Sequence, residues 1–502
     1  NVIGVLGILQ HVVRGRGSGF EGVEVEPLLL STDPNFRPVA LQFGLDGALY
    51  VCDWHNALIG HMQHSVRDPN RDTTHGRIWR VTYPSRPLPE LPKIESASIS
   101  SLLDLLKEPA YRVRAAVRRE LWSRDPVQVG NAMRNWRKAQ DPSDPGFAHH
   151  AMEVHWVQTR LRQTDRDLWE ELLKSPDARG RAAAVRSISN LGAGNSWSRE
   201  WLRQAIRDDH PRVRLEAVLA LSFLRDRDAV TTTLQALQAP RDEYLNYALN
   251  ETLETLRPNW EFDDELLTRD TDASSYLLAR LSTSRLEELP AAVRVVIELI
   301  GRNDRSITSR LDDLRRLAPA RGRSAGHILV NAIEHATRHH NPLEEDTVAG
   351  FAEVLRELST EELQDVQEAG RKLATSDSGA GARRLGFAIL LRSDPTSEIS
   401  PPGAQRNGPW MGDLWRAIPL LPSAEQRLVS GSLLQGLARL SDSASRRAAL
   451  DVLPELGLSP AEVLATIWPW RKHAELTDAV LAALDRLNPA EVPPDRLQSV
   501  LM

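Results

Sequence analysis

A short motif that recurs along a Leu-, Ala- and Arg-rich stretch limits the fold of this chain more than any other feature. Its clearest copy is Pro211-Arg-Val-Arg-Leu-Glu-Ala217, which has the form Pro-x-Val-Arg-x-x-Ala. Related copies begin at Tyr111, Arg179 and Ala292, and Arg179 and Arg212 are 33 residues apart. That spacing fits one helical pair. Because a single pair cannot bury its own apolar face, the repeat predicts a stack of helical pairs, an α-solenoid.

Each part of the motif has a physical role near the start of a helix. Asp209 and Pro211 suit a helix start, because a carboxylate stabilises the positive end of the helix dipole and proline lacks an N–H that would be unpaired there. Ala217 is small and lets the partner helix approach. The motif resembles the HEAT-repeat signature. We therefore predict a mainly α chain, with HEAT-like repeats over residues 93–310 and a continuing helical repeat region over residues 311–502.

Residues 1–92 have a different, β-type character. Two strand-like runs, at residues 2–13 and 23–30, flank Arg14-Gly-Arg-Gly-Ser-Gly19, and this arrangement predicts a hairpin. A Gly-rich loop can also bind phosphate, but that function needs a strand that runs into a helix. Here a second strand follows, so we favour the hairpin.

Three more strand-like segments and a linker complete this region. Strands are predicted at residues 38–43, 48–53 and 77–83, and the first two are joined across Asp46-Gly47, a strong hairpin turn signal. Four prolines between residues 84 and 92 predict an extended linker to the helices.

The end of the β region carries a dense motif that resembles a known family. It reads Asp-Gly-x-Leu-Tyr-Val-x-Asp-Trp from Asp46, then Gly-His-Met-Gln-His-Ser-x-Arg-Asp-Pro-Asn-Arg-Asp-x-Thr-His-Gly-Arg-Ile-Trp-Arg from Gly60. Residues 1–92 thereby resemble the membrane-bound dehydrogenases of the planctomycete and verrucomicrobial type. In that family a β-propeller similar to quinone-dependent glucose and sorbosone dehydrogenases precedes HEAT repeats and usually a c-type cytochrome domain.

The chain departs from this family pattern in three ways. Leu45 stands where proline is common, His55 stands where an aromatic residue is common, and the cytochrome domain is missing. The strand-like segments amount to about one four-stranded blade, whereas a propeller needs at least about four blades to close. The chain begins with Asn1 and without a signal-peptide pattern. We therefore expect a fragment that starts inside a domain and holds the last blade or so of a propeller.

The resemblance implies a function for the parent protein. It would be an extracytoplasmic sugar or alcohol dehydrogenase, periplasmic or associated with the cell envelope, with a quinone cofactor similar to PQQ. For this chain alone we expect no cofactor and no independent turnover. Its solenoid would dock a protein partner, or the propeller and cytochrome domains outside this sequence. The alternative is a non-enzymatic HEAT scaffold with a ligand-binding propeller head.

Composition argues against several other classes. The chain has 62 Lys and Arg against 68 Asp and Glu, a net charge of -6, so a general nucleic-acid role is not indicated. The chain has no run of about 18 apolar residues, the length that a helix needs to span a bilayer. Cys52 is the one cysteine, which excludes an intrachain disulfide and a Cys-x-x-Cys-His haem attachment motif.

The loop between residues 53 and 77 concentrates the polar residues that could form a site. The catalytic candidates are His64, Arg67 and His75. The cofactor-binding candidates are Arg37, Asp53, His55, His61, Arg71, Asp72 and Arg77. In one interpretation a histidine accepts a proton from an alcohol substrate while an arginine fixes an acidic cofactor.

Two other interpretations of this loop stay open. Imidazoles of His55, His61 and His64, with a carboxylate of Asp53 or Asp68, would suit a transition metal. Alternatively, the Asp, Asn and Arg side chains hold a long loop together by hydrogen bonds and ion pairs, and that loop docks the β region on the solenoid.

The remaining histidines, tryptophans and arginines favour structural roles. His335 and His339 are four residues apart, but no Glu follows the first of them as in a zincin, so a helix end is favoured over a metal site. His149 is expected on a helix surface. Trp54 and Trp79 are expected in the core of the blade. Arginine pairs on the repeat helices predict solvated faces with internal ion pairs; they are Arg112 with Arg114 and Arg212 with Arg214.

Overall fold

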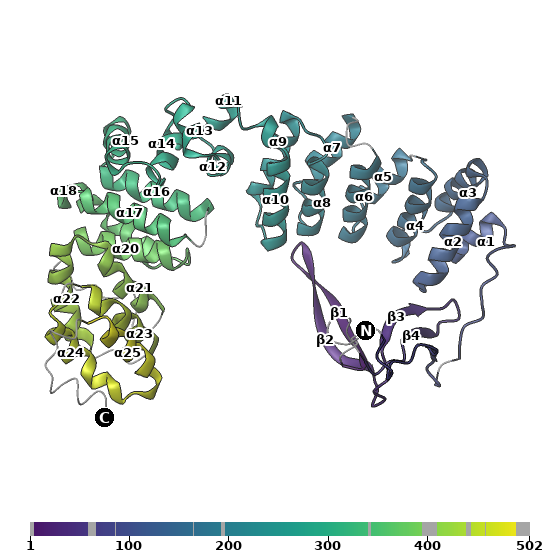
Figure 1. Ribbon diagram of the computed structural model, residues 1–502. Helices are drawn as coiled ribbons and strands as arrows, with labels where there is room; N and C mark the ends of the chain where they lie inside the picture. Colours follow the sequence, from purple (N-terminus) through teal and green to yellow (C-terminus); the bar gives the residue numbers. More distant parts are fainter. Residues whose placement is uncertain are drawn as a thin grey trace. The chain divides into compact units, whose positions relative to one another are not determined.

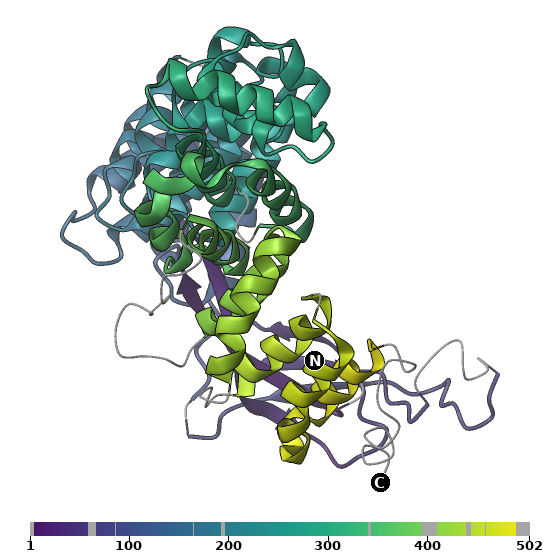
Figure 2. The same cartoon turned by 90° about the vertical axis from the view of Figure 1, so that its left-hand side faces the viewer.

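The structure is a computed structural model, and its contacts divide the chain into two compact units, Asn1–Asn259 (unit 1) and Trp260–Met502 (unit 2). Figures 1 and 2 show that strands precede the helices of unit 1 and that unit 2 is built from helices. No described helix is long and apolar enough to cross a membrane. The described residues are 5–58, 67–85, 87–163, 165–191, 196–339, 343–393, 409–437, 443–456 and 458–487.

The β region contains two small antiparallel sheets. Strands β1 (Gly7–Arg16) and β2 (Gly19–Leu30) form a two-stranded hairpin. Strands β3 (Pro38–Phe43), β4 (Leu49–Asp53) and β5 (Arg77–Val81) form a three-stranded sheet in that order. The predicted antiparallel segments are confirmed, and their place in a propeller stays a prediction.

The hairpin turn is tighter than the sequence indicated. Both strands extend into the Gly-rich segment, so that only Gly17 and Ser18 lie between them. Gly17 has a φ of 56°, a left-handed conformation that glycine adopts without a Cβ clash. Glycine at the first position of a two-residue hairpin loop is typical of a type II′ turn.

A small apolar core holds the two sheets together. Ile8 of β1 packs with Phe36, Leu49 and Val51, and all four side chains are buried. Among the described residues no further strand pairs with β3 or β5, and Ile78 on β5 is 73% exposed. The β region therefore has little buried apolar surface of its own, which makes its contacts with the helices important for its position.

The helices of unit 1 follow the predicted repeats. Copies of the motif lie at the starts of α2, α6 and α8, and Pro211 takes the first helical position of α8 as predicted. The apolar stripe of α10 faces the interior, since Leu245, Leu249 and Leu253 are fully buried. The helices are α1 (Ile99–Leu105), α2 (Tyr111–Ser123), α3 (Pro126–Lys138), α4 (Phe147–Arg160), α5 (Arg166–Leu173), α6 (Ala178–Leu191), α7 (Ser196–Ala205), α8 (Pro211–Leu221), α9 (Arg227–Thr233) and α10 (Glu243–Thr255).

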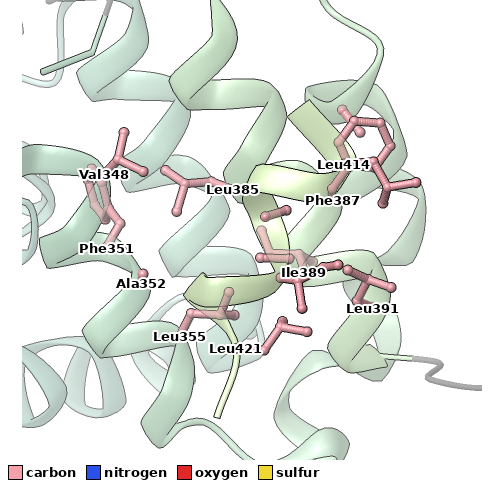
Figure 3. Packing of buried hydrophobic residues seen from close by; sticks show 14 of the residues in the cluster. Val348, Phe351, Ala352, Leu355, Leu385, Phe387, Ile389, Leu391, Leu414 and Leu421 are labelled. Carbon is pink, nitrogen blue, oxygen red and sulfur yellow. The ribbon is translucent and has the colours of Figure 1, made fainter. Parts of the chain in front are cut away.

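Unit 2 is helical throughout its described residues and has its own core. Figure 3 shows Phe351 of α17 and Leu385 and Ile389 of α20 in one cluster, and all three side chains are fully buried. Its helices are α11 (Asp264–Leu267), α12 (Asp272–Leu278), α13 (Thr283–Glu288), α14 (Val293–Ile300), α15 (Ile307–Ala320), α16 (Ala325–His339), α17 (Glu345–Glu357), α18 (Thr360–Leu363), α19 (Gln367–Ala374), α20 (Ala380–Ser393), α21 (Pro409–Ala417), α22 (Ser423–Leu437), α23 (Ser443–Val452), α24 (Pro460–Ile467) and α25 (Thr477–Asp485).

Candidate functional site

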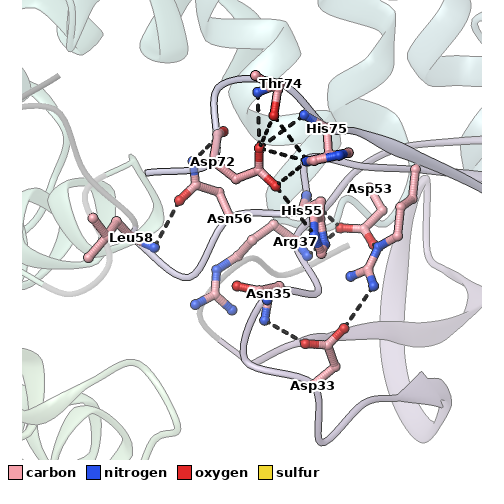
Figure 4. Close-up of polar contacts among 11 residues, drawn as sticks. Asp33, Asn35, Arg37, Asp53, His55, Asn56, Leu58, Asp72, Thr74 and His75 are labelled. Atoms are coloured by element: carbon pink, nitrogen blue, oxygen red, sulfur yellow. Dashed lines mark hydrogen bonds and ion pairs between the residues drawn. The ribbon is translucent and has the colours of Figure 1, made fainter. Parts of the chain in front are cut away.

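The carboxylate of Asp53, at the end of β4, is the centre of the polar residues in the β region. Its Oδ1 accepts hydrogen bonds from the backbone N–H of Arg37 at 2.7 Å and of His55 at 2.9 Å (Figure 4). Its Oδ2 accepts from Arg77 Nε at 2.7 Å and from Trp79 Nε1 at 2.9 Å. Burial opposes the charge, but these donors hold the pKa of Asp53 below its ordinary value. Four donors occupy the acceptor sites of this carboxylate, which leaves it poorly suited to act as a base.

Arg77 joins this centre to the segment that precedes β3. Its Nη1 donates to Asp33 Oδ2 at 2.9 Å while its Nε binds Asp53, so one guanidinium bridges two carboxylates. The guanidinium also lies over the ring of Trp79, 5.1 Å from its centroid. Trp54 and Trp79 are each 44% exposed, and the expectation that they lie in the core is wrong. The core of the β region is too small to hold them, and Trp79 stands at its edge, where its N–H reaches Asp53.

A second carboxylate, Asp72, shapes the loop before β5. Its Oδ1 accepts from the backbone N–H groups of Thr74 at 2.9 Å and of His75 at 3.0 Å, and its Oδ2 lies 2.9 Å from His75 Nδ1. The Thr74 N–H is the main cause that lowers the pKa of Asp72. His55 Nε2 lies 3.6 Å from the same carboxylate. These contacts match the interpretation in which the polar side chains hold the loop together.

The remaining candidates of the loop are placed only in part. Arg67 is exposed and Arg71 is half-buried on the turn before Asp72. His61 and His64 lie outside the described residues, so the metal site that needs them stays a prediction. Within the described part of the chain, no three His, Cys, Asp or Glu side chains gather closely enough to hold a metal ion.

Three buried nitrogen atoms near Asp53 have no hydrogen-bond partner among the described residues. They are Arg37 Nε, His55 Nδ1 and Arg77 Nη2. Arg37 is 6% exposed and uses its Nη2 on the carbonyl oxygen of Ala57 at 3.0 Å. His55 has a φ of 54°, a conformation that non-glycine residues rarely adopt and that turns the chain sharply after β4. Buried polar atoms without partners are unusual. The residues that carry these three all contact Asp53, Arg37 and His55 through the backbone N–H and Arg77 through Nε.

The histidines of the helices have structural partners. His335 is 2% exposed, and its Nε2 lies 2.8 Å from Glu298 Oε2, which makes it a buried histidine of the unit 2 interior. The side chains of His339 and His340 lie outside the described residues. His149 is half-exposed as expected and lies 3.4 Å from Glu153.

The hairpin tip docks on the repeats, and sequence reasoning missed this contact. Ser18 is fully buried, its N–H donates to Asp242 Oδ2, and its Oγ donates to Asp242 Oδ1 at 2.7 Å. The Arg212 Nη1 donates to the Ser18 carbonyl oxygen at 3.1 Å, and its guanidinium lies 4.9 Å from the centroid of the Phe20 ring. A Cβ added at Gly19 would lie 2.5 Å from the ring of Tyr244. The tip is thus held between α8 and α10 by what we call the tip contact, Ser18 with Asp242 and Arg212.

Two further contacts join the β region to the helices of unit 1. Arg16 and Glu243 form an exposed ion pair at 2.9 Å beside the tip contact. Near the other end of the repeats, Arg112 Nε donates to the carbonyl oxygen of Phe43 at 2.9 Å. The β region is docked on the solenoid by the hairpin tip and by β3, whereas the prediction gave this role to the loop between residues 53 and 77. In the sequence Asp242 can be recognised as an N-cap but not as a docking residue. It does cap α10, because it accepts a hydrogen bond from the Leu245 N–H at 2.9 Å.

The second arginine of the repeat motif links neighbouring repeats. Arg114 donates through Nη1 to the carbonyl oxygen of Glu108 at 2.6 Å, in the loop before its own helix, and through Nε to Glu153 at 2.9 Å. Arg181 does the same with its own preceding loop and with Asp208, which its Nε reaches at 2.8 Å. Internal ion pairs were predicted for the repeat arginines, and Arg114 forms one with Glu153. The predicted solvated faces are wrong at Arg114 and Arg214, because both side chains are largely buried between repeats.

Arg214 completes the series with backbone acceptors alone. Its Nη1 donates to the carbonyl oxygen of Asp208 at 2.8 Å, and its Nη2 donates to that of Pro240 at 2.8 Å. The side chain is 5% exposed. We call Arg114, Arg181 and Arg214 the linking arginines, because each joins the loop before its helix to the next repeat.

Two family models match parts of this chain. HEAT repeats match residues 166–254, and a domain of unknown function (DUF7133) matches residues 8–85. No curated protein matches the chain. Among solved structures, the crystal structure of the S. pombe condensin Cnd3-Cnd2 subcomplex is similar at 13% identity and a TM-score of 0.23, over 78% of this chain and 64% of that chain. The HEAT match and the packed helical pairs show HEAT-type repeats within the helical part of this chain, an architecture suited to protein interaction.

Proposed function

We propose that this chain is a HEAT-type protein-interaction scaffold that carries a fixed β region, and that it serves a sugar or alcohol dehydrogenase-like oxidoreductase of the cell envelope. The tip contact is the observation that carries the scaffold proposal, because it makes the β region and the repeats one structural piece. The link to an oxidoreductase rests on the resemblance of the motif from Asp46 to Arg80.

The chemistry of the β region supports docking over turnover by this chain alone. Asp53 accepts four hydrogen bonds, and Asp72 is engaged with Thr74 and His75. Neither carboxylate offers a vacant acceptor for a substrate proton. A general base has to lie within hydrogen-bond reach of the proton that it accepts, with a free lone pair.

The partnerless nitrogens favour a second candidate function, a ligand-binding head. Arg37 Nε and Arg77 Nη2 are donors, and both suit the oxygen atoms of a carboxylated quinone. Arg37, His55 and Arg77 would hold such a group beside Asp53. A bound quinone supplies the two-electron acceptor for alcohol oxidation. In this candidate the chain binds the quinone without oxidising a substrate.

One set of measurements separates the two candidates. The purified chain is assayed for dye-linked oxidation of glucose and ethanol with added pyrroloquinoline quinone, and quinone binding is followed by tryptophan fluorescence. The chain is then immobilised, and envelope extract of the source cells is passed over it. The scaffold proposal expects no turnover by the chain alone and dye-linked dehydrogenase activity retained on the column.

The outcomes decide between the proposals. Turnover by the chain alone would overturn the scaffold proposal, and so would a column that retains no dehydrogenase activity. Saturable quinone binding that weakens in Arg37→Lys, without turnover, would favour the ligand-binding head. Arg14→Lys is the matched control, because Arg14 is exposed on β1.

A further inference from the structure

Two neighbouring helices of unit 2, α14 and α16, line a basic cavity of about 420 Å³. Residues spaced by three and four along α16 face it, namely Ile328, Asn331, His335 and Arg338. The volume lies within the range of small-molecule sites, roughly 300 to 1,000 Å³. Cavity residues come from unit 2 alone, and none of them belongs to the candidate site of the β region.

The walls of the cavity carry an excess of positive charge. Four arginines line it, Arg294, Arg321, Arg323 and Arg338, against the single carboxylate of Asp270. Arg294 Nε lies 2.6 Å from Asp270 Oδ1, and Arg321 Nη2 lies 3.6 Å from Asp270 Oδ2. Arg294 is the main cause that lowers the pKa of Asp270, so this carboxylate stays charged.

One more carboxylate stands beside the cavity. Asp272 Oδ1 lies 3.8 Å from both Arg294 and Arg338. Four guanidiniums and two carboxylates leave two positive charges without a counter-charge. Arg323 and Asn331 have no side-chain hydrogen bond or ion pair with the described residues, so both are available to a ligand.

Arg294 departs from the other copies of the repeat motif. It occupies the position of the linking arginines, which donate to carbonyl oxygens of the loop before their own helix. Arg294 instead meets Asp270 at the cavity, and its side chain is 22% exposed. A position that elsewhere joins one repeat to the next here presents its guanidinium to a cavity.

We propose that this cavity binds a small organic phosphate monoester. The net charge of the cavity complements a group that carries roughly two negative charges at neutral pH. Arginine forks match the geometry of phosphate oxygens. The apolar side chains of Val293, Ile297 and Ile328 form a wall for an uncharged portion of the ligand. This inference is independent of the dehydrogenase-related function proposed above.

Isothermal titration of the full chain with phenyl phosphate tests the proposal, with inorganic phosphate and benzoate as comparison probes. We expect saturable binding of phenyl phosphate, binding about tenfold or more weaker for the monoanion benzoate, and weaker binding at high salt. Arg323→Gln and Arg338→Gln should each weaken phenyl phosphate about tenfold. Arg371→Gln is the matched control, since Arg371 is an exposed arginine of the same unit, 2.9 Å from Glu368. It should leave the affinity unchanged.

Asp270→Asn distinguishes a ligand site from a purely structural ion-pair network. Removing the competing carboxylate should tighten phenyl phosphate binding several-fold, whereas a structural network predicts lower stability and no change in binding. Where Asp270→Asn does not fold, Asp272→Asn makes the same test, because Asp272 has a 73% exposed side chain. No saturable binding, an equal loss in Arg371→Gln, or weaker binding after removal of either aspartate would each overturn the proposal.

Discussion

A buried arginine at one position of the repeat motif links neighbouring HEAT repeats of unit 1 by hydrogen bonds. A linking arginine has five N–H donors in a rigid planar fork and can satisfy carbonyl oxygens of two loops at once. Arg214 reaches the loops at Asp208 and Pro240 in this way. Since buried carbonyl oxygens need partners, the arginine replaces water at the junction between repeats.

Arg214→Lys should therefore destabilise unit 1. A lysine has one nitrogen on a flexible stem and leaves carbonyl oxygens of the two loops unsatisfied, which costs about 2 kcal/mol. Arg179→Lys is the control, because the Arg179 side chain is 91% exposed and pairs only with Asp177 at the surface. It should change the free energy of unfolding by less than about 0.5 kcal/mol. Urea unfolding followed by tryptophan fluorescence measures both, and equal effects would contradict the role of Arg214.

His155 on α4 makes the stability of unit 1 depend on pH. It is 2% exposed, and its Nδ1 accepts a hydrogen bond from Trp169 Nε1 at 2.7 Å. Burial lowers the pKa of His155 to about 4 from its ordinary value of 6.5. Between these two values the unfolded chain binds more protons than the folded chain, so stability falls as the pH falls through this window.

At pH 5 this histidine should cost about 2 kcal/mol of stability relative to pH 7.5. The variant His155→Gln keeps an acceptor for Trp169 and does not titrate. Urea unfolding of both proteins at the two pH values isolates the histidine, because the carboxylates titrate alike in each. A wild-type protein that loses no more stability than His155→Gln between pH 7.5 and 5 would show that His155 does not titrate in this way.

At the scale of elements, the hairpin owes its position to a contact between residues 224 positions apart in the chain. Ser18 and Gly19 are small enough to approach α10, and Asp242 accepts from Ser18 while it caps that helix. An isolated two-stranded hairpin is marginally stable in water. The tip contact is therefore expected to hold the ends of β1 and β2 in their observed place.

Asp242→Asn tests this expectation without removing the helix cap. Asparagine caps a helix as well as aspartate, so α10 should keep its stability. It offers one acceptor oxygen in place of two and no charge, so Ser18 loses a partner. Hydrogen exchange of the amides in β1 and β2 should become about tenfold faster, while α10 is unchanged. Asp226→Asn, at the N-cap of α9, is the matched control. Unchanged protection of the hairpin would contradict the role of the tip contact.

The elements themselves were largely predictable from local sequence. The motif at Pro211 predicted a helix that the structure contains, and Asp46-Gly47 predicted the turn between β3 and β4. These signals are periodicity and turn chemistry, which depend on neighbours along the chain. The docking of Ser18 on Asp242 could not be predicted in this way. An aspartate at an N-cap has the same local sequence whether or not a second element also binds its carboxylate.

The candidate site was predictable in composition but not in arrangement. The sequence placed Asp53, His55, Asp72 and His75 in one loop region, and the structure brings them together. That Asp53 would be saturated by donors depends on Arg37 and on two residues of β5, which pair with β4 only after the loop closes. Whether a carboxylate is free or occupied is a property of the fold.

At the scale of the whole molecule, each unit carries its own interior. The core around Phe351 lies in unit 2, while the core that includes Val117 and Leu121 lies in unit 1. The sequence predicted the change from β region to helices near residue 92, and α1 begins soon after, at Ile99. Within the helices the sequence predicted a boundary at residue 310, while the contacts of the folded chain divide it after Asn259.

The β region contacts the helices of unit 1 at two places that are far apart along the repeats. The Phe43 carbonyl oxygen binds Arg112 on α2, and Ser18 binds Asp242 at the start of α10 (Figure 1). A stack of repeats that contact only their neighbours can bend along its length. Here the β region joins α2 to the start of α10. We therefore expect the repeats between these contacts to bend less, so that a partner meets a surface whose curvature changes little.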